Sequence, residues 1–224
     1  MNGVAPAPVV VRTLGRRPYA ATRDAMIAFT QARDAGTADE IWLLEHDPVY
    51  TLGQAGRLEH LHGTVDVPVV RTERGGQITY HGPGQLVAYL LIDLRRRDLK
   101  VRSFVELIEA AVVDVLAAYN LRSTTKPGAP GVYAMVDGDL QKVAALGLKI
   151  VNGRSFHGLS LNVAMDLSAY APIDACGYPG LVSTDLRSLG VDTDVDTAGR
   201  LVADRLTDRL QRASRASDAG DAPR

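Results

Sequence analysis

Hydrophobic and polar positions along the chain follow a helical spacing in three places. Residues 19–35 carry Ala25, Met26, Phe29 and other apolar side chains at this spacing, and Gly36 is a suitable stop. A continuous apolar stripe predicts a second helix from Ser103, as its N-cap, to residue 120. A third amphipathic stripe predicts a helix over residues 198–212.

Strand-like apolar runs occupy most of the chain between these helices. They predict strands over residues 40–45, 67–71, 85–94, 131–136, 141–151 and 158–165. The run at 85–94 is almost continuously apolar, as expected of a strand covered on both faces. The turn sequences Asp137-Gly138-Asp139 and Asn152-Gly153 are typical of hairpins and favour an antiparallel meander over crossover helices.

These elements predict an α+β fold, a two-layer α/β arrangement, in which helices flank a mixed, mainly antiparallel β-sheet. We find no internal repeat and no linker, so we expect a single domain over residues 16–213. Residues 1–15 are expected to form a flexible N-terminus. The polar, alanine-rich residues 214–224 are expected to form a disordered tail.

Composition narrows the range of functions. The net charge is -1, with 25 basic and 26 acidic residues, which argues against a nucleic-acid partner. No apolar run approaches the ~20 residues of a membrane span, and no basic signal region precedes the first apolar stretch. A single cysteine is compatible with a reducing compartment, so we expect a cytoplasmic protein. The run Arg95-Arg96-Arg97 is either a solvated strand end or a patch that steers an acidic carrier protein.

A glycine-rich segment, RGGQITYHGPGQ at residues 74–85, is the first candidate for chemistry. Its four glycines allow the backbone to approach a ligand closely. The segment matches neither the phosphate-binding nor the dinucleotide-binding glycine motif, so we expect no nucleotide cofactor from it. His60-Leu61-His62 has the alternation of two metal ligands on a strand, but no cysteine or carboxylate pattern completes a zinc site. We therefore expect no metal.

Cys176 is the only cysteine, and such a residue is most often a small packed hydrophobe. Its neighbours are turn-forming residues, which place it in a loop whose backbone N–H groups are free to hold an oxyanion. A reactive thiol needs a basic or cationic neighbour. Spacing selects none of the five histidines, and Lys142 is an equal candidate; the histidines are His46, His60, His62, His81 and His157.

Lys142 opens an apolar run, and strand alternation predicts that it shares a face with Ala144, Leu146 and Leu148. A partly desolvated ammonium there exchanges protons closer to neutral pH, and the three apolar side chains would bound a tunnel for an alkyl chain. The alternative is a lysine that snorkels at a strand end.

The next strand also alternates. Small or polar residues share one face and apolar residues the other; the first group is Gly158, Ser160 and Asn162, and the second is Leu159, Leu161 and Val163. The small face either lines a site or is an ordinary half-exposed strand face.

Four segments, in this order and spacing, resemble the octanoyltransferases of lipoate biosynthesis. They are RGGQITYHGPGQ at 74–85, KVAALG at 142–147, HGLSLN at 157–162 and ACG at 175–177. The resemblance extends from about Glu45 to Leu189. It implies a fold shared with the biotin and lipoate protein ligases.

The resemblance also implies an activity and a set of site residues. An octanoyl group would pass from octanoyl-acyl carrier protein to a lysine of the lipoyl domains of 2-oxoacid dehydrogenase E2 subunits and of the glycine cleavage H protein, with no cofactor. Cys176 would carry the acyl thioester, and Lys142 would lower the pKa of its thiol and shuttle protons. The implied substrate contacts are Arg74, Gly75, Gly76, Gln77, Ile78, Thr79, Tyr80, His81, Ala145, Leu146, Gly147, Gly158, Leu159 and Ser160.

Two residues depart from the family pattern, and two other functions stay open. Ala164 stands where many relatives carry a polar residue, and Ala175 replaces a proline common before the cysteine. An ATP-dependent lipoate or biotin ligase would share the fold without needing Cys176. A non-catalytic acyl-binding module would use Cys176 only for packing.

Overall fold

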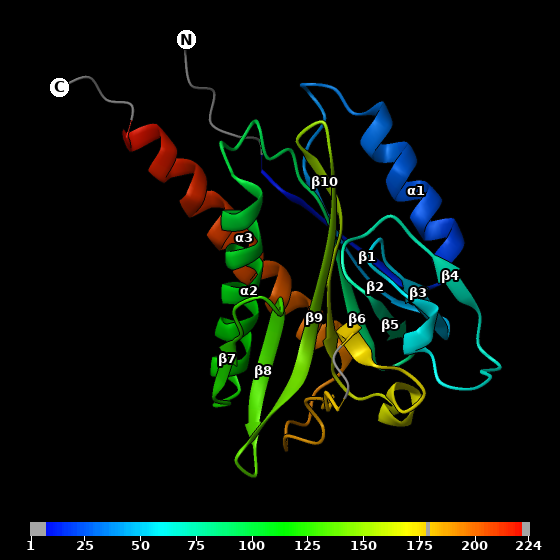
Figure 1. Cartoon of the computed structure of the whole chain (residues 1–224). Helices are drawn as coiled ribbons and strands as arrows, with labels where there is room; N and C mark the ends of the chain where they lie inside the picture. Colours follow the sequence, from blue (N-terminus) through cyan, green and yellow to red (C-terminus); the bar gives the residue numbers. More distant parts are fainter. Residues whose placement is uncertain (1–7, 178–179, 221–224) are drawn as a thin grey trace.

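A seven-stranded β-sheet forms the centre of the molecule (Figure 1). The computed structural model describes residues 8–177 and 180–220, and of Cys176 and residues 215–220 it describes the backbone alone. In spatial order the strands are β1 (Val10–Arg17), β2 (Glu40–His46), β6 (Gln85–Leu91), β10 (Arg154–Asn162), β9 (Asp139–Val151), β8 (Gly131–Val136) and β7 (Ser123–Thr125). Among the described strands of this sheet, β1 and β2 pair in parallel and all other pairs are antiparallel, so the predicted mixed, mainly antiparallel sheet is confirmed.

A second sheet of three strands lies beside the first. Its order is β4 (Val69–Arg71), β3 (Val49–Leu52) and β5 (Ile78–His81). Strands β3 and β5 are not among the strands predicted from the sequence, because each has only four residues and is flanked by glycine or proline. Three short 3-10 helices accompany this region, η1 (Leu58–His60), η2 (Leu167–Tyr170) and η3 (Ala175–Gly177).

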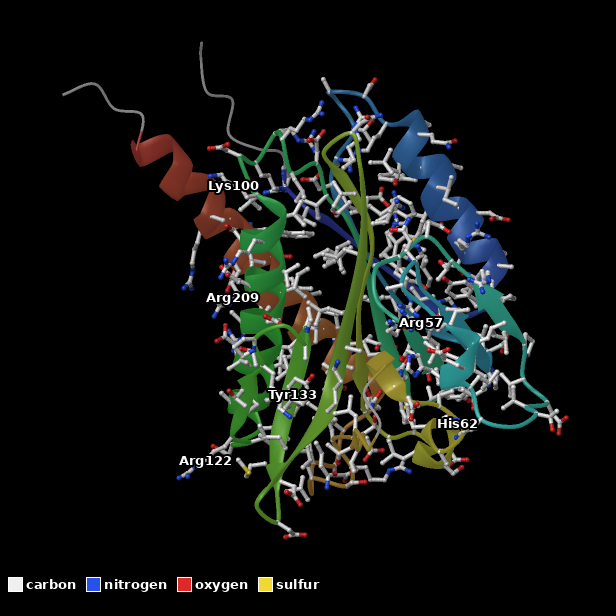
Figure 2. All side chains as sticks on the ribbon, in the orientation of Figure 1. Arg57, His62, Lys100, Arg122, Tyr133 and Arg209 are labelled. Carbon is white, nitrogen blue, oxygen red and sulfur yellow. The ribbon has the colours of Figure 1, made fainter. Side chains whose placement is uncertain are left out.

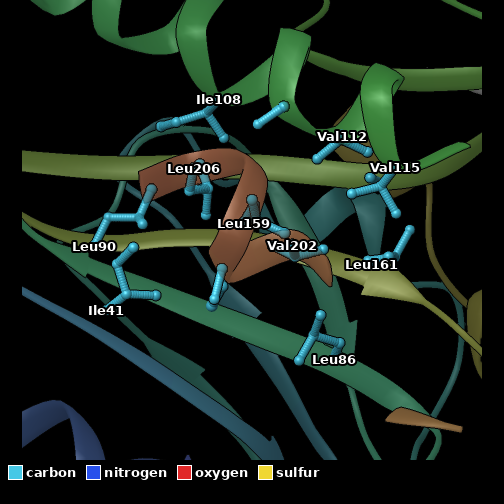
Figure 3. Close-up of a cluster of buried hydrophobic side chains, with 14 of the residues drawn as sticks. Ile41, Leu86, Leu90, Ile108, Val112, Val115, Leu159, Leu161, Val202 and Leu206 are labelled. Atoms are coloured by element: carbon cyan, nitrogen blue, oxygen red, sulfur yellow. The ribbon is translucent and has the colours of Figure 1, made fainter. Parts of the chain in front are cut away.

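Helices cover both faces of the large sheet. Helices α2 (Val101–Ala118) and α3 (Val195–Gly220) pack on one face, and α1 (Tyr19–Ala32) packs on the other (Figure 1). The main core forms where alternate side chains of β2, β6 and β10 meet the two helices (Figure 3). Strand β6 contributes to the clusters on both faces, which confirms that this apolar run is covered twice. Within the described ranges, no helix is both long and apolar enough to span a bilayer.

Several predicted boundaries are wrong; for example, the strand predicted over residues 158–165 is β10, Arg154–Asn162. Residues 10–15, expected to be flexible, belong to β1, because a parallel partner was available in β2 from Glu40 onward. The predicted tail overlaps α3, whose backbone is helical to Gly220, since alanine favours helix. Ser103 does not cap α2. The N-cap is Lys100, and it makes no side-chain cap hydrogen bond.

Two arginines of the predicted solvated or carrier-steering run, Arg96 and Arg97, contribute to a buried ion cluster, whereas Arg95 is exposed. Asp39 is fully buried and accepts from Arg33 at 2.5 Å, Arg96 at 2.7 Å and Arg97 at 2.6 Å. Burial alone would raise the pKa of Asp39, but the N–H of Asp93 and the guanidinium groups of Arg97 and Arg33 hold that pKa below its usual value. The cluster ties the loop after β6 to the loop before β2, and so it holds these two paired strands together.

A β-bulge in β9 changes which face Lys142 occupies. Val132 pairs with Ala144, but Tyr133 pairs with Lys142, so Val143 is an extra residue. Val143 and Ala144 both enter the helix-side core, whereas Lys142 shares the opposite face with Tyr133. The prediction that Lys142 and Ala144 share a face is therefore wrong. Strand alternation holds only where the ladder is regular.

Candidate functional site

One cavity of about 510 Å³ opens between the glycine-rich segment, β9, β10 and the start of α2. The predicted site residues that line it are Arg74, Gly75, Gly76, Gln77, Ile78, Thr79, His81, Lys142, Ala145, Leu146, Gly147, Gly158, Leu159 and Ser160. Tyr80 is the exception. Its ring packs 5.2 Å from that of Tyr50 and 6.2 Å from that of Tyr170, inside the small-sheet core. The tertiary structure thus brings three sequence segments to one cavity of ligand-binding size.

Arg74 holds the glycine-rich segment in place. Its buried guanidinium donates to the hydroxyl and carbonyl oxygens of Thr51, and to the carbonyl oxygens of Gly75 and Gln77, at 2.6–3.2 Å. The N–H of Gly75 donates to the carbonyl of Leu148 on β9 at 2.8 Å. The segment therefore forms a fixed wall of the cavity, and several N–H donors of Arg74 are used in the hydrogen bonds that fix it.

Glycine is required where the walls come closest together. A Cβ on Gly147 would lie 3.0 Å from Arg74 Cδ and 3.1 Å from the carbonyl oxygen of Gly75. A Cβ on Gly158 would overlap the carbonyl oxygen of Ala88 on β6. Two of the predicted contact glycines thus let neighbouring backbone segments approach each other, in addition to lining the cavity.

Lys142 is buried at one end of the cavity. Its Nζ donates to the carbonyl oxygen of Pro130 at 2.9 Å and lies 5.3 Å from the centroid of the Tyr133 ring. A snorkelling lysine would keep its ammonium in water, so this alternative does not describe Lys142.

Residues 174–177, which we call the cysteine loop, lie close to Lys142. The side chain of Cys176 lies outside the described residues, but its backbone forms η3 together with Ala175 and Gly177. Ala175 and Lys142 line the same small void. A Cβ on Gly177 would lie 2.9 Å from Gln77 Cγ. Both neighbours of Cys176 therefore face walls of the candidate site.

The segment after the cysteine is hydrogen-bonded to the backbone of Lys142. The N–H of Lys142 donates to the carbonyl of Val182 at 2.9 Å, and the N–H of Thr184 donates to the carbonyl of Lys142 at 3.0 Å. This short parallel pairing adds residues 182–184 alongside β9. Residues more than thirty positions apart in sequence are thereby held side by side.

The two histidines of the His60-Leu61-His62 pattern contact Asp174, which lies two residues before Cys176. His60 Nδ1 and His62 Nε2 each lie 3.1 Å from one oxygen of Asp174. Hydrogen bonds from these two rings lower the pKa of the Asp174 carboxyl. Backbone bonds join the same two segments, from Asp174 N–H to His60 O at 2.9 Å and from His62 N–H to Pro172 O at 2.7 Å. In the part of the chain that the structure describes, no three potential ligands gather as a metal site.

Three histidines form a buried aromatic cluster with Tyr19 and Tyr89. His46 Nε2 lies 2.6 Å from the Tyr89 hydroxyl, and the His81 ring stacks 6.3 Å from that of Tyr19. Burial lowers the pKa of all three histidines. The pKa of His81 falls to about 3, where His46 adds to the effect, and that of His157 falls to about 4 although the Glu73 carboxylate opposes the shift. These rings are neutral near pH 7.

Several cavity residues were not among the predicted contacts. They are Tyr19, Val87, Tyr89, Val101, Val105, Gly128, Ala129, Pro130, Ile150 and His157. His157 is the first residue of the HGLSLN motif, so the sequence carried a signal for it, and Leu148 lines the cavity as one of the predicted tunnel residues. The others come from helix starts, loops and a strand interior, and local sequence carries no signal that these places meet.

Comparisons with known proteins agree with this geometry. A family model described as the lipoyl protein ligase A/B catalytic domain matches residues 19–206. An octanoyltransferase of Thiobacillus denitrificans is 54% identical over 223 residues, covering 95% of this chain and 99% of that protein. An octanoyltransferase of Burkholderia multivorans is 57% identical over 217 residues, covering 96% of this chain and 88% of that protein.

A solved structure confirms the predicted fold type. The bipartite lipoate protein ligase of Thermoplasma acidophilum superposes with a TM-score of 0.71 at 15% identity, covering 93% of this chain and 91% of that one. At that identity the likeness establishes the fold alone. The family match and the sequence relatives go further: the chain belongs to the lipoyl protein ligase A/B catalytic domain family, and within it to the octanoyltransferases.

Proposed function

We propose that the chain transfers an octanoyl group from octanoyl-acyl carrier protein to a lysine of a lipoyl domain, through a thioester on Cys176. The observation that supports the proposal is that Ala175, next to Cys176, lines one small void together with the buried Lys142. The proposed acceptors are lipoyl domains of 2-oxoacid dehydrogenase E2 subunits and of the glycine cleavage H protein. A cytoplasmic location stays a prediction.

The acyl group would lie along the apolar part of the cavity. Leu146, Leu148, Leu159 and Ile150 line the cavity, and so do the neutral rings of His81 and His157. Ala144, proposed from sequence as a tunnel residue, is buried in the helix-side core, so Ala145 takes its place on the cavity wall.

In the first step the thiolate of Cys176 attacks the carrier thioester. A bond forms between its sulfur and the acyl carbon, the bond to the carrier sulfur breaks, and the carrier thiolate takes a proton. Backbone N–H groups near Ala145 to Gly147 or at Cys176 would hold the oxyanion. The N–H of Lys142 itself is engaged with Val182, so it is not one of them.

In the second step the acceptor lysine must first lose a proton, because an ordinary lysine is an ammonium at neutral pH. Its amine then attacks the acyl carbon, an amide forms, and the Cys176 thiolate leaves while one proton passes to solvent. Replacing a thioester by an amide is downhill, so the reaction needs no ATP. A buried lysine amine at Lys142 is the proposed acceptor for the lysine proton.

Intact-mass measurement after mixing with octanoyl-acyl carrier protein tests the proposal. We expect an added octanoyl mass on the wild type, none on Cys176→Ala, and slow formation on Lys142→Ala. Lys100→Ala is the matched control, because Lys100 is exposed at the start of α2 (Figure 2). An adduct that persists on Cys176→Ala would refute the covalent route. Transfer that requires octanoate and ATP would favour the ligase alternative.

A further inference from the structure

The ammonium of Lys142 contacts two groups that take no part in the proposed reaction steps. Besides the Pro130 carbonyl, it faces the ring of Tyr133, which is its cross-strand partner in the β8–β9 ladder. Gly131 leaves room for the lysine stem, since a Cβ there would overlap Lys142 Cε. Its N–H donates to Glu109 on α2 at 2.8 Å, which anchors the strand start.

Tyr133 acts on Lys142 in a second way. Its hydroxyl donates to the carbonyl of Ala129 at 3.0 Å, immediately before the Pro130 carbonyl that accepts from Lys142. The ring of Tyr133 therefore faces the Lys142 ammonium directly. Its hydroxyl acts indirectly, because it holds residues 129–130, which include the carbonyl that accepts from Lys142. Only 1% of the Tyr133 surface is exposed, so these contacts are made in a desolvated setting.

A second cation approaches the same ring. Lys126 Nζ lies 4.6 Å from the Tyr133 centroid, and Lys126 and Tyr133 both line a separate groove of about 680 Å³ beyond the cavity. Tyr133, on β8 (Figure 2), thus lies between the groove on one side and the catalytic lysine on the other.

We propose that Tyr133 is a positioning residue for Lys142, whose ring keeps the lysine charged and fixed beside the cysteine loop in the resting enzyme. The negative face of an aromatic ring stabilises a cation, and the Pro130 carbonyl adds to this. This inference rests on the proposed function, and it assigns the order of events at Lys142. The lysine starts as an ammonium that stabilises the thiolate, and it gives its proton to the departing carrier thiolate. The resulting amine then takes the proton of the acceptor lysine.

The pH dependence of thiol alkylation tests this role. The chain has one cysteine, so iodoacetamide, followed by intact mass, reports on Cys176 alone. For Tyr133→Leu we expect the pH of half-maximal alkylation to rise by roughly half a pH unit or more, since the ring no longer stabilises the ammonium. Tyr133→Phe keeps the ring and should keep the wild-type midpoint, while octanoyl transfer slows because the bond to Ala129 is lost.

Controls separate this role from a merely structural one. Tyr119→Leu removes a half-buried tyrosine that pairs with Thr193, and it should leave the midpoint unchanged. Should Tyr133→Leu fail to fold by circular dichroism, Tyr133→Met tests the same expectation with a flexible filler. A folded Leu or Met variant with the wild-type midpoint overturns the inference. Wild type that alkylates normally but forms no octanoyl adduct overturns the proposed function, and this inference with it.

Discussion

Acidification should destabilise this protein well above the pH at which carboxylates titrate. His81 and His157 are buried, and their pKa values fall to about 3 and about 4 in the folded state. In the unfolded chain both regain an ordinary pKa near 6.5. Because the folded-state values are depressed, the contribution to stability is complete above about pH 6.5 and is lost as the pH falls from there toward 4.

The size of the effect follows from proton linkage. At pH 5 the unfolded chain binds almost one more proton than the folded protein at each of the two histidines. For one such proton, the free energy of unfolding falls by about 1.4 kcal/mol for each pH unit of acidification. Between pH 7 and pH 5 each histidine therefore removes about 2 kcal/mol, or about 4 kcal/mol for the pair. This is a large part of the stability of a typical domain.

Urea unfolding at pH 7, 6 and 5 measures this loss of stability. Trp42 is the only tryptophan and is 8% exposed, so its fluorescence reports the transition. His157→Asn should remove about half of the pH dependence, about 2 kcal/mol. Asparagine tolerates the left-handed backbone of this position, where φ is 60°. His62→Gln is the control, because the His62 side chain is 54% exposed. An unchanged pH dependence in His157→Asn would refute the reasoning.

Three further variants test the construction of the site. Gly158→Ala should lower the free energy of unfolding, measured in urea, by about 3 kcal/mol, because its Cβ would overlap the Ala88 carbonyl. Gly36→Ala is the control and should change little, because its Cβ would make only an ordinary contact at 3.6 Å. Equal losses in the two variants would contradict this. Asp39→Asn should lower the melting temperature through a loss of about 3–5 kcal/mol, since it leaves buried guanidinium groups without their carboxylate, and a melt like that of wild type would argue against the cluster. Arg74→Lys should lose about 2 kcal/mol and slow octanoyl transfer, because a lysine cannot reproduce the fork that braces the glycine-rich segment; transfer at the wild-type rate would show that the bracing is dispensable.

Local sequence determined much of the fold. The helices at α1 and α2 and the strands at β2, β6 and β8 follow from apolar spacing, because burial of one face or both faces imposes that spacing. The two hairpins follow from Asp137-Gly138 and Asn152-Gly153, whose positive φ values are those that the turn requires. The motif positions in residues 74–81, 145–147 and 158–160 were likewise available from sequence, by resemblance.

Other features depended on partners far away in sequence. Strand β1 exists because β2 offers it a parallel edge, and the arginines after β6 turn inward because Asp39 lies buried beneath them. The face of Lys142 was mispredicted because a single extra residue, Val143, enters the ladder only when β8 pairs with β9.

The sequence by itself determined which residue types the chemistry has available: one cysteine, a glycine-rich wall and a lysine at the head of an apolar run. Only the tertiary structure decided that the backbone after the cysteine pairs with that lysine, and that Tyr133 and Pro130 hold its ammonium. The physical reason is that periodicity records how a residue is buried, whereas the identity of its partner depends on pairings between segments that periodicity does not encode.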